Sequence, residues 1–240
     1  MAFSPYKQAP DEVKLLREKL QLDFVGGYLF WGEEEYLKLH YTSELRDKIR
    51  QEGMAEFNLV TVEMEKGETI SDLERALETP PVFASHKMVE VTGLKLLELT
   101  REEEKQLIEA VDKRASDTVL VFFFYNDDIN LSSKKTRTRK IVQELEKRLM
   151  LVRFPRQTKE KLLSWTDRIF SSSSVHISDV LIERMIELCD FSMMRVRSES
   201  EKLICRAKAE NVNTITREWV DESVRPSAEK QLWDLTDAIL

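Results

Sequence analysis

The sequence predicts an α/β fold with a mainly parallel sheet, followed by a smaller helical region. Five short apolar segments alternate with charged segments of helical periodicity over residues 1–155. Alternation of this kind is typical of parallel strands connected by crossover helices. After Pro155 the apolar residues recur only at helical spacing, so we expect no further strand there.

The predicted strands are short, and one of them is apolar throughout. The run from Val119 to Phe124 contains no polar residue, as expected for a central strand covered on both faces. The other strands are predicted at residues 27–31, 57–62, 87–91 and 151–154. The helices are predicted from Pro10, over residues 34–51, after the capping boxes Ser71-Asp-Leu-Glu74 and Thr100-Arg-Glu-Glu103, and over residues 134–149.

The region after Pro155 has the pattern of a small helical bundle. Helices are predicted over residues 156–170, 178–190 and 192–210, and Thr216 is expected to cap a further helix. We therefore predict an α/β domain at 1–155, a three-helix domain at 156–213 and the start of another helical domain at 214–240. Because the chain stops inside the apolar segment Ala238-Ile-Leu240, we expect this last domain to be cut short.

Composition excludes several classes of protein. Of the 240 residues, 42% are hydrophobic and only six are Gly and six Pro, which excludes disordered and collagen-like chains. A net charge of −7 argues against a protein that coats nucleic acid, but it permits a local basic patch. The two cysteines exclude a disulfide framework and indicate a reducing compartment. The longest apolar run, residues 119–125, is far shorter than the roughly 20 residues of a bilayer helix, so we expect a cytoplasmic protein without a membrane partner.

An α/β domain followed by a helical lid resembles a RecA-like nucleotide-binding protein, so the phosphate loop is the first motif to seek. That loop has the pattern Gly-x-x-x-x-Gly-Lys-Ser/Thr, in which backbone N–H groups and the lysine bind phosphate. After the first predicted strand the chain has Gly32-Glu-Glu-Glu-Tyr36, and neither Gly-Lys-Ser nor Gly-Lys-Thr occurs anywhere. The three carboxylates would repel phosphate, and we expect no lysine at this loop to neutralise the phosphate charge. We therefore expect no nucleotide and no cofactor.

Catalytic and metal-binding patterns are absent from the sequence. The run Glu33–Glu35 could bind a cation, but acids are also favourable at a solvated helix N-terminus. Asp127 and Asp128 follow the central strand and could hold Mg²⁺, although a turn is the simpler interpretation. The three histidines share no zinc-ligand spacing with the cysteines. We therefore predict no catalytic residue and no metal ligand.

One segment is strongly basic in an otherwise acidic chain. From Lys134 to Lys161 there are eleven Lys or Arg residues against three Glu residues, a net charge of +8. Basic residues on one helix can follow a phosphate backbone. The candidate DNA-contacting residues are Lys134, Lys135, Arg137, Arg139 and Lys140. The alternative is a solvated helix face that balances acidic neighbours, and the absence of interleaved aromatic residues favours it.

The segment Thr79-Pro-Pro-Val-Phe-Ala-Ser85 is unusual because two prolines force an extended exit from the preceding helix. By pattern alone, Phe83 is expected in the core, where phenylalanine is usually buried. The alternative is an exposed apolar tip formed by Val82 and Phe83, which would serve as an anchor for a protein partner.

Four segments together resemble the delta subunit of bacterial DNA polymerase III, the "wrench" of the clamp loader. They occur in the same order as in that family and span nearly the whole chain. They are Gly27-Tyr-Leu-Phe-Trp-Gly-Glu-Glu-Glu-Tyr-Leu37, Glu74-Arg-Ala-Leu-Glu-Thr-Pro-Pro-Val-Phe-Ala-Ser-His-Lys87, Glu199-Ser-Glu-Lys-Leu203 and Arg225-Pro-Ser-Ala-Glu-Lys-Gln-Leu-Trp-Asp-Leu-Thr-Asp-Ala-Ile239.

The resemblance implies a RecA-like (AAA+-like) domain without an ATP site, a three-helix lid and the start of a helical collar. It implies that Val82 and Phe83, where the family commonly has Leu-Phe, bind the sliding clamp (the beta subunit). The subunit would open one ring interface for loading onto primed DNA, as a non-catalytic part of the polymerase (nucleotidyltransferase) holoenzyme at the bacterial nucleoid. The collar would bind the other loader subunits. We therefore expect this chain to be a monomer that fails to co-sediment with them.

Two other interpretations remain open at the level of sequence. One is an active RecA-like ATPase whose site has an unrecognised pattern, and a thermal melt with nucleotide would separate it from the first. The other is a DNA-binding module that uses residues 134–161, for which salt-dependent binding to primed DNA would be the evidence.

Overall fold

The computed structural model describes residues 11–125, 129–137 and 139–224. The chain forms two compact units, within residues 1–155 and 156–240. The first contains α1 (Glu12–Leu22), β1 (Gly27–Trp31), α2 (Glu35–Glu52), α3 (Ala55–Asn58), β2 (Leu59–Glu63), the 3₁₀ helix η1 (Met64–Lys66), α4 (Ile70–Glu78), β3 (Lys87–Thr92), α5 (Arg101–Asp112), β4 (Thr118–Phe123), α6 (Lys134–Arg137), α7 (Lys140–Glu146) and β5 (Met150–Arg153).

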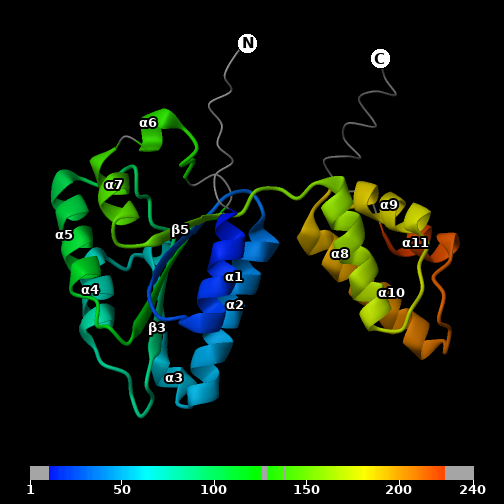
Figure 1. Ribbon diagram of the computed structural model, residues 1–240, viewed down its shortest axis with the longest axis horizontal. Helices are drawn as coiled ribbons and strands as arrows, with labels where there is room; N and C mark the ends of the chain where they lie inside the picture. The colour runs from blue at the N-terminus through cyan, green and yellow to red at the C-terminus, as the bar shows by residue number, and fades with distance from the viewer. Residues whose placement is uncertain (1–10, 126–128, 138, 225–240) are drawn as a thin grey trace. The chain divides into compact units, whose positions relative to one another are not determined.

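The five strands form one parallel sheet in the order β2-β3-β4-β1-β5. The predicted α/β class and parallel sheet are therefore confirmed. In Figure 1, α4, α5 and α7 cover one face of the sheet, and α1 and α2 cover the other. β4 lies centrally between β3 and β1 and is buried along its whole length, which explains its uninterrupted apolar sequence.

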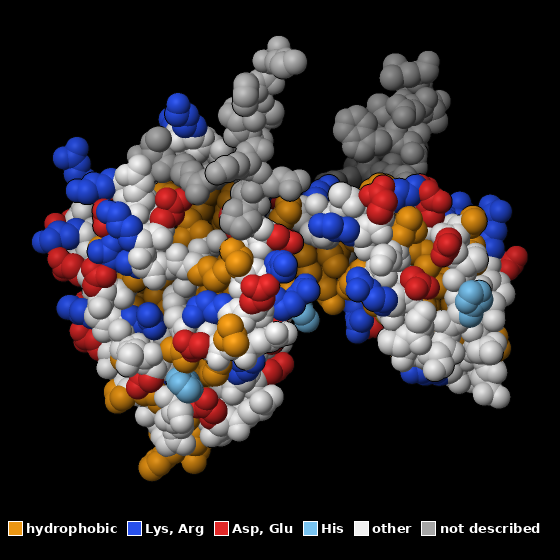
Figure 2. Space-filling model, in the orientation of Figure 1, with side chains coloured by type: hydrophobic (Ala, Val, Ile, Leu, Met, Phe, Trp, Pro, Cys, Tyr) orange, Lys and Arg blue, Asp and Glu red, His pale blue; other side chains and the backbone are white. Residues whose placement is uncertain are grey.

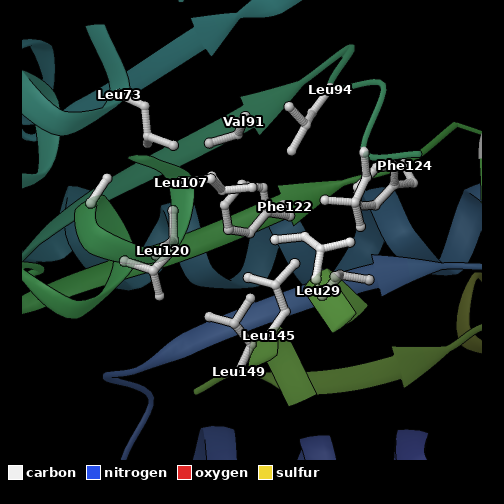
Figure 3. Packing of buried hydrophobic residues seen from close by; sticks show 14 of the residues in the cluster. Leu29, Leu73, Val91, Leu94, Leu107, Leu120, Phe122, Phe124, Leu145 and Leu149 are labelled. Carbon is white, nitrogen blue, oxygen red and sulfur yellow. The ribbon is translucent and has the colours of Figure 1, made fainter. Parts of the chain in front are cut away.

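The alternation of side chains along the strands divides the hydrophobic core into two layers. Leu29 and Phe122 belong to the layer under α4, α5 and α7, which also contains Leu73 and Leu107 (Figure 3). Their strand neighbours point to the opposite layer under α1 and α2. That second layer includes Leu16, Leu20, Tyr28, Phe30, Tyr41, Leu45, Ile49, Val119 and Val121.

In each edge strand, β5 and β2, one backbone N–H group donates a hydrogen bond to a carboxylate. At β5, Glu12 Oε2 of α1 accepts the N–H of Arg153 at 2.6 Å. At β2, the carboxylate of Glu68 accepts the N–H of Glu63. Unpaired edges invite pairing with other chains, so these two acidic side chains help to end the sheet at five strands.

Three local predictions differ from the structure. The second strand begins at Leu59, because the preceding residues form the short helix α3. Helix α4 begins at Ile70, because Ile70 shares an apolar stripe with Leu73 and Leu77; its capping box is therefore formed by Thr69 and Asp72. The predicted basic helix at 134–149 is two short helices, α6 and α7. The capping box at Thr100 is confirmed by the bond from the Glu103 N–H to the Thr100 hydroxyl.

The second unit contains α8 (Lys159–Ser172), α9 (Asp179–Leu188), α10 (Met193–Ala209) and α11 (Arg217–Ser223). Thr216 caps α11 by accepting the N–H of Trp219, as predicted. Helix α11 packs on α9 and α10 and forms the ion pairs Arg184–Asp221 and Arg206–Glu222. Residues 225–240, which form most of the predicted collar segment, lie outside the described residues.

An ion pair between a buried carboxylate and a half-buried guanidinium connects α2 to β3 of the sheet. Glu90 of β3 is 4% exposed and pairs with Arg46 of α2. Burial raises the pKa of Glu90, and the guanidinium of Arg46 opposes that rise. Removing one member of a buried pair leaves an uncompensated charge, so the stability of this layer depends on Arg46.

We predict that Arg46→Leu lowers the free energy of unfolding by about 3 kcal/mol at pH 8. The control Arg50→Leu breaks an exposed pair with Asp47 on the same helix and should cost less than about 1 kcal/mol. Without Arg46, folded Glu90 binds a proton more tightly than unfolded Glu90. The stability of the variant should therefore rise as the pH falls from 8 towards 5. Urea melts across this range test both effects, and equal costs for the two variants would contradict the analysis.

Candidate functional site

The strongest candidate site is the turn at residues 79–86, between α4 and β3. Phe83 at its tip is 89% exposed and has a left-handed backbone conformation, with φ of 48°. The core position that the pattern alone favoured is therefore wrong, and the exposed alternative describes this side chain. Val82 is half-buried beside it. An exposed phenylalanine on a constrained turn is unusual for a surface and suits a contact with another protein.

The start of the tip is held by Asn58, the last residue of α3. The Oδ1 atom of Asn58 accepts the N–H of Val82 at 2.8 Å, and its Nδ2 donates to the Val82 carbonyl at 2.9 Å. Asn58 itself is fully buried. One side chain thus satisfies both backbone polar groups of Val82, 24 residues away in sequence.

The two ends of the turn are held by other side chains. Glu52 of α2 accepts the backbone N–H of His86 at 2.8 Å and contacts its Nδ1 at 2.6 Å. Burial alone would raise the pKa of Glu52, but the hydrogen bonds from His86 together lower it. The buried amine of Lys87 donates to the carbonyls of Ala76 and Thr79, and burial lowers the pKa of this lysine.

Two further exposed apolar residues lie close to the turn in the structure. Met54 and Phe57 are 45% and 58% exposed, and Phe57 lines a hollow of about 290 Å³ together with Thr79 and Pro80. Figure 2 shows hydrophobic side chains gathered at the tip of this unit where α3 and the turn lie in Figure 1. Neither residue was predicted as part of the site; Phe57 was expected in a strand, whereas it lies in α3.

The edge of the sheet where a nucleotide would bind is closed by its own backbone. After β1 the chain turns directly into α2, and the N–H of Glu34 donates to the Phe154 carbonyl at 2.9 Å. A side chain on Gly32 would meet that same carbonyl at 2.6 Å. Glu34 is 5% exposed. A phosphate cradle requires a wider loop with N–H groups directed at the ligand, and this short turn does not provide one.

One lysine at this end of the sheet was not predicted as part of the site. Lys38 lies six residues after Gly32, the spacing that separates the first glycine from the lysine in a phosphate loop. Leu37 and Leu39 replace the second glycine and the hydroxyl residue. Lys38 is fully buried, and its Nζ donates to the Phe124 carbonyl at 2.6 Å. The expectation that no lysine is placed there is therefore corrected: one is present, and it bonds to Phe124, the residue after β4.

The predictions of no metal site and no membrane-spanning segment can be compared only with the described residues. Within residues 11–125, 129–137 and 139–224, no group of three or more His, Cys, Asp or Glu side chains is arranged to hold a metal ion. Asp127 and Asp128, the alternative Mg²⁺ site, lie outside those ranges. No helix in the described part of the chain combines the length and apolar character needed to cross a membrane.

Part of the basic segment is neutralised by acidic neighbours. Arg139 donates to the Leu97 carbonyl and pairs with Glu104 of α5. Lys140 lines a groove of about 790 Å³ between α5 and α7 that also contains Glu104 and Glu144. Lys134 and Lys135 are exposed on α6, which also contains Arg137. Figure 2 shows basic and acidic side chains interspersed on this flank. Other ion pairs in the segment involve Lys147, Arg148, Arg153 and Lys159.

Comparison with protein families gives one match. The sequence model described as "DNA polymerase III, delta subunit" matches residues 28–155, which is more than half of the chain. That range contains the turn and the closed nucleotide edge. Comparison by sequence with curated proteins finds no match.

Three solved structures show that the fold is RecA-like (AAA+-like), as predicted. The Bacillus subtilis DNA clamp loader delta protein (YqeN) is similar with a TM-score of 0.61 and 19% identity, over 95% of this chain and 66% of that chain. The Thermotoga maritima RuvB Holliday junction branch migration motor has a TM-score of 0.56 and 11% identity, over 88% and 65%. Domain III of the Thermotoga maritima replication initiation protein DnaA has a TM-score of 0.54 and 11% identity, over 94% and 100%. This chain thus spans just under two thirds of the length of the first two.

We predict that millimolar Mg-ATP or Mg-ADP leaves the melting temperature unchanged. The turn after β1 has no phosphate cradle, and the amine of Lys38 is bonded to Phe124. Any nucleotide that binds the folded state must raise its stability, by roughly 2.7 kcal/mol at a hundredfold excess over Kd. Differential scanning fluorimetry with and without nucleotide is the measurement.

Lys38→Met distinguishes a structural role for this lysine from a role in binding phosphate. If the lysine is structural, the substitution leaves the Phe124 carbonyl without this donor and should cost about 1–3 kcal/mol in a denaturant melt. The response to nucleotide should stay at zero. A thermal shift with ATP that appears in the wild-type chain and disappears in the variant would restore the ATPase interpretation.

Proposed function

Because the chain belongs to the DNA polymerase III delta subunit family, we propose that it is a clamp-loader subunit that binds the sliding clamp through Val82 and Phe83. The observation that supports this most directly is the 89% exposure of Phe83 on a turn anchored to α2 and α3. The name of the Bacillus subtilis relative, a clamp loader delta protein, agrees with the proposal.

Anchoring should matter for affinity because a flexible turn would lose conformational entropy on binding. The two prolines before Val82 restrict the backbone, and Asn58 and Glu52 fix two later positions. Phe83 can then enter an apolar pocket of the clamp without much ordering. An aromatic side chain buried at the centre of an interface is the usual source of a large share of the binding energy.

The proposed mechanism involves binding without covalent chemistry. If the chain binds the open form of the ring more tightly than the closed form, binding shifts the equilibrium towards opening. The subunit needs no nucleotide of its own for this step. Contacts with the other loader subunits through the collar, and with primed DNA through Lys134, Lys135 and Arg137, belong to the same proposal.

We predict that Phe83→Ala weakens clamp binding at least about thirtyfold, which corresponds to roughly 2 kcal/mol. The fold should stay nearly intact, because the side chain is mostly in solvent. Leu22→Ala is the matched control, since Leu22 is also 89% exposed and lies at the end of α1. It should leave both binding and melting unchanged. Val82→Ala should weaken binding less than Phe83→Ala, because valine has less area to bury.

Titration calorimetry with the cognate clamp and a parallel denaturant melt test this prediction. Unchanged clamp affinity of Phe83→Ala would remove the turn from the interface. If the wild-type chain binds primed DNA but not the clamp, with affinity that falls steeply as salt rises, the DNA-binding interpretation replaces the present one.

A further inference from the structure

We propose that Asn58 is a positioning residue that holds Val82 and Phe83 in the conformation that binds the clamp. The identity of the partner, the sliding clamp, rests on the proposed function. The anchoring of the turn by Asn58 does not. Asn58 is fully buried and would not touch the clamp itself. It would act through the backbone of Val82.

The geometry of Asn58 matches that of a backbone partner. Its side-chain amide presents an acceptor and a donor, as a peptide group does. These two atoms satisfy the N–H and the carbonyl of one residue, Val82, at 2.8 and 2.9 Å. The amide therefore makes the two hydrogen bonds that a neighbouring strand would make to the backbone of Val82. A second, longer contact, 3.5 Å from Nδ2 to the Gly53 carbonyl, connects the same amide to the end of α2.

The turn depends on such bonds because it has few of its own. Pro80 and Pro81 have no backbone N–H. Over residues 80–86, the hydrogen bonds made by the backbone go to the side chains of Asn58 and Glu52. Phe83 has a φ of 48°, which non-glycine residues seldom adopt. A turn in this conformation would relax into several others if its bonds to Val82 were removed.

The position of Asn58 also explains why loss of its hydrogen bonds should weaken binding to the clamp. Val82 directly precedes Phe83, so a rotation of its peptide redirects the exposed ring. If only a fraction of molecules hold the ring correctly, the apparent Kd increases by the inverse of that fraction. Loss of two neutral hydrogen bonds is expected to lower the fraction about tenfold.

The experiment compares Asn58→Leu with the wild-type chain in two measurements. Leu has the same branching and the same number of side-chain heavy atoms as Asn, with neither donor nor acceptor. We expect clamp binding about tenfold weaker and amide exchange of Val82 about tenfold faster. Ile49→Val, a mild core change in α2, controls for a general loss of stability and should leave both unchanged. If Asn58→Leu does not fold, Asn58→Ser serves as the second variant.

A double-mutant cycle distinguishes positioning from a general effect. Because Phe83 is expected to make the larger contact, Asn58→Leu should cost clearly less clamp affinity in the Phe83→Ala background than in the wild-type chain. Equal losses with and without Phe83, or unchanged Val82 exchange in Asn58→Leu, would overturn the proposal. If the wild-type chain binds no clamp, the proposed function fails. The Val82 exchange rate would then still decide whether Asn58 positions the turn.

Discussion

The parallel placement of β3 between β2 and β4 is the constraint on which the rest of the first unit depends. In a parallel sheet all strands begin at one end of the sheet, here called the amino edge, and all finish at the opposite end, the carboxyl edge. Connections that enter strands therefore lie at the amino edge, and those that leave strands lie at the carboxyl edge. The turn before β3 is therefore at the amino edge, whereas Gly32 and Lys38 follow β1 at the carboxyl edge. Because the two sites are on opposite edges, one can change while the other keeps its geometry.

At the carboxyl edge the crevice in which RecA-like proteins place phosphate is filled by the chain itself. RecA-like sheets place phosphate in the crevice after the first strand. In this chain the short turn after β1 is hydrogen-bonded to Phe154, and Lys38, at the spacing of the phosphate-loop lysine, donates to the Phe124 carbonyl. Both polar groups are thus bonded within the chain. The RecA-like architecture is kept because the two-layer core on either side of the sheet does not depend on the crevice.

The amino edge is organised by side chains that bond to backbone. Asn58, Glu52 and Lys87 together fix a turn that has almost no regular backbone bonding. Each of them is partly or fully buried, so water competes weakly for these bonds. Their combined effect is to leave one large apolar side chain, Phe83, outside a structure that is otherwise rigid at that point. Such an arrangement favours recognition of a partner over stability of the free chain.

Much of the architecture could be predicted from sequence, because the signals are local. The apolar run at 119–124, the strand and helix alternation up to Pro155 and the caps at Thr100 and Thr216 are all set by residues within a few positions of one another. Periodicity and capping report that local preference directly. The division of residues 134–146 into two short helices was missed. Arg139 is extended between them and donates to the carbonyl of Leu97, 42 residues away, a contact that local periodicity does not report.

The candidate site depended on tertiary structure for the same reason. Pattern alone placed Phe83 in the core, since hydrophobicity indicates that a side chain can be buried but not that a buried position exists for it. The bonds that make it protrude come from Asn58 and Glu52, and the partner of Lys38 is 86 residues away. Ion pairs to residues distant in sequence, such as Arg139–Glu104 and Arg148–Asp112, likewise neutralise part of the basic segment. Sequence determined the strands, most helices and the missing loop motif; only long-range packing decided which side chains those elements bury and which they expose.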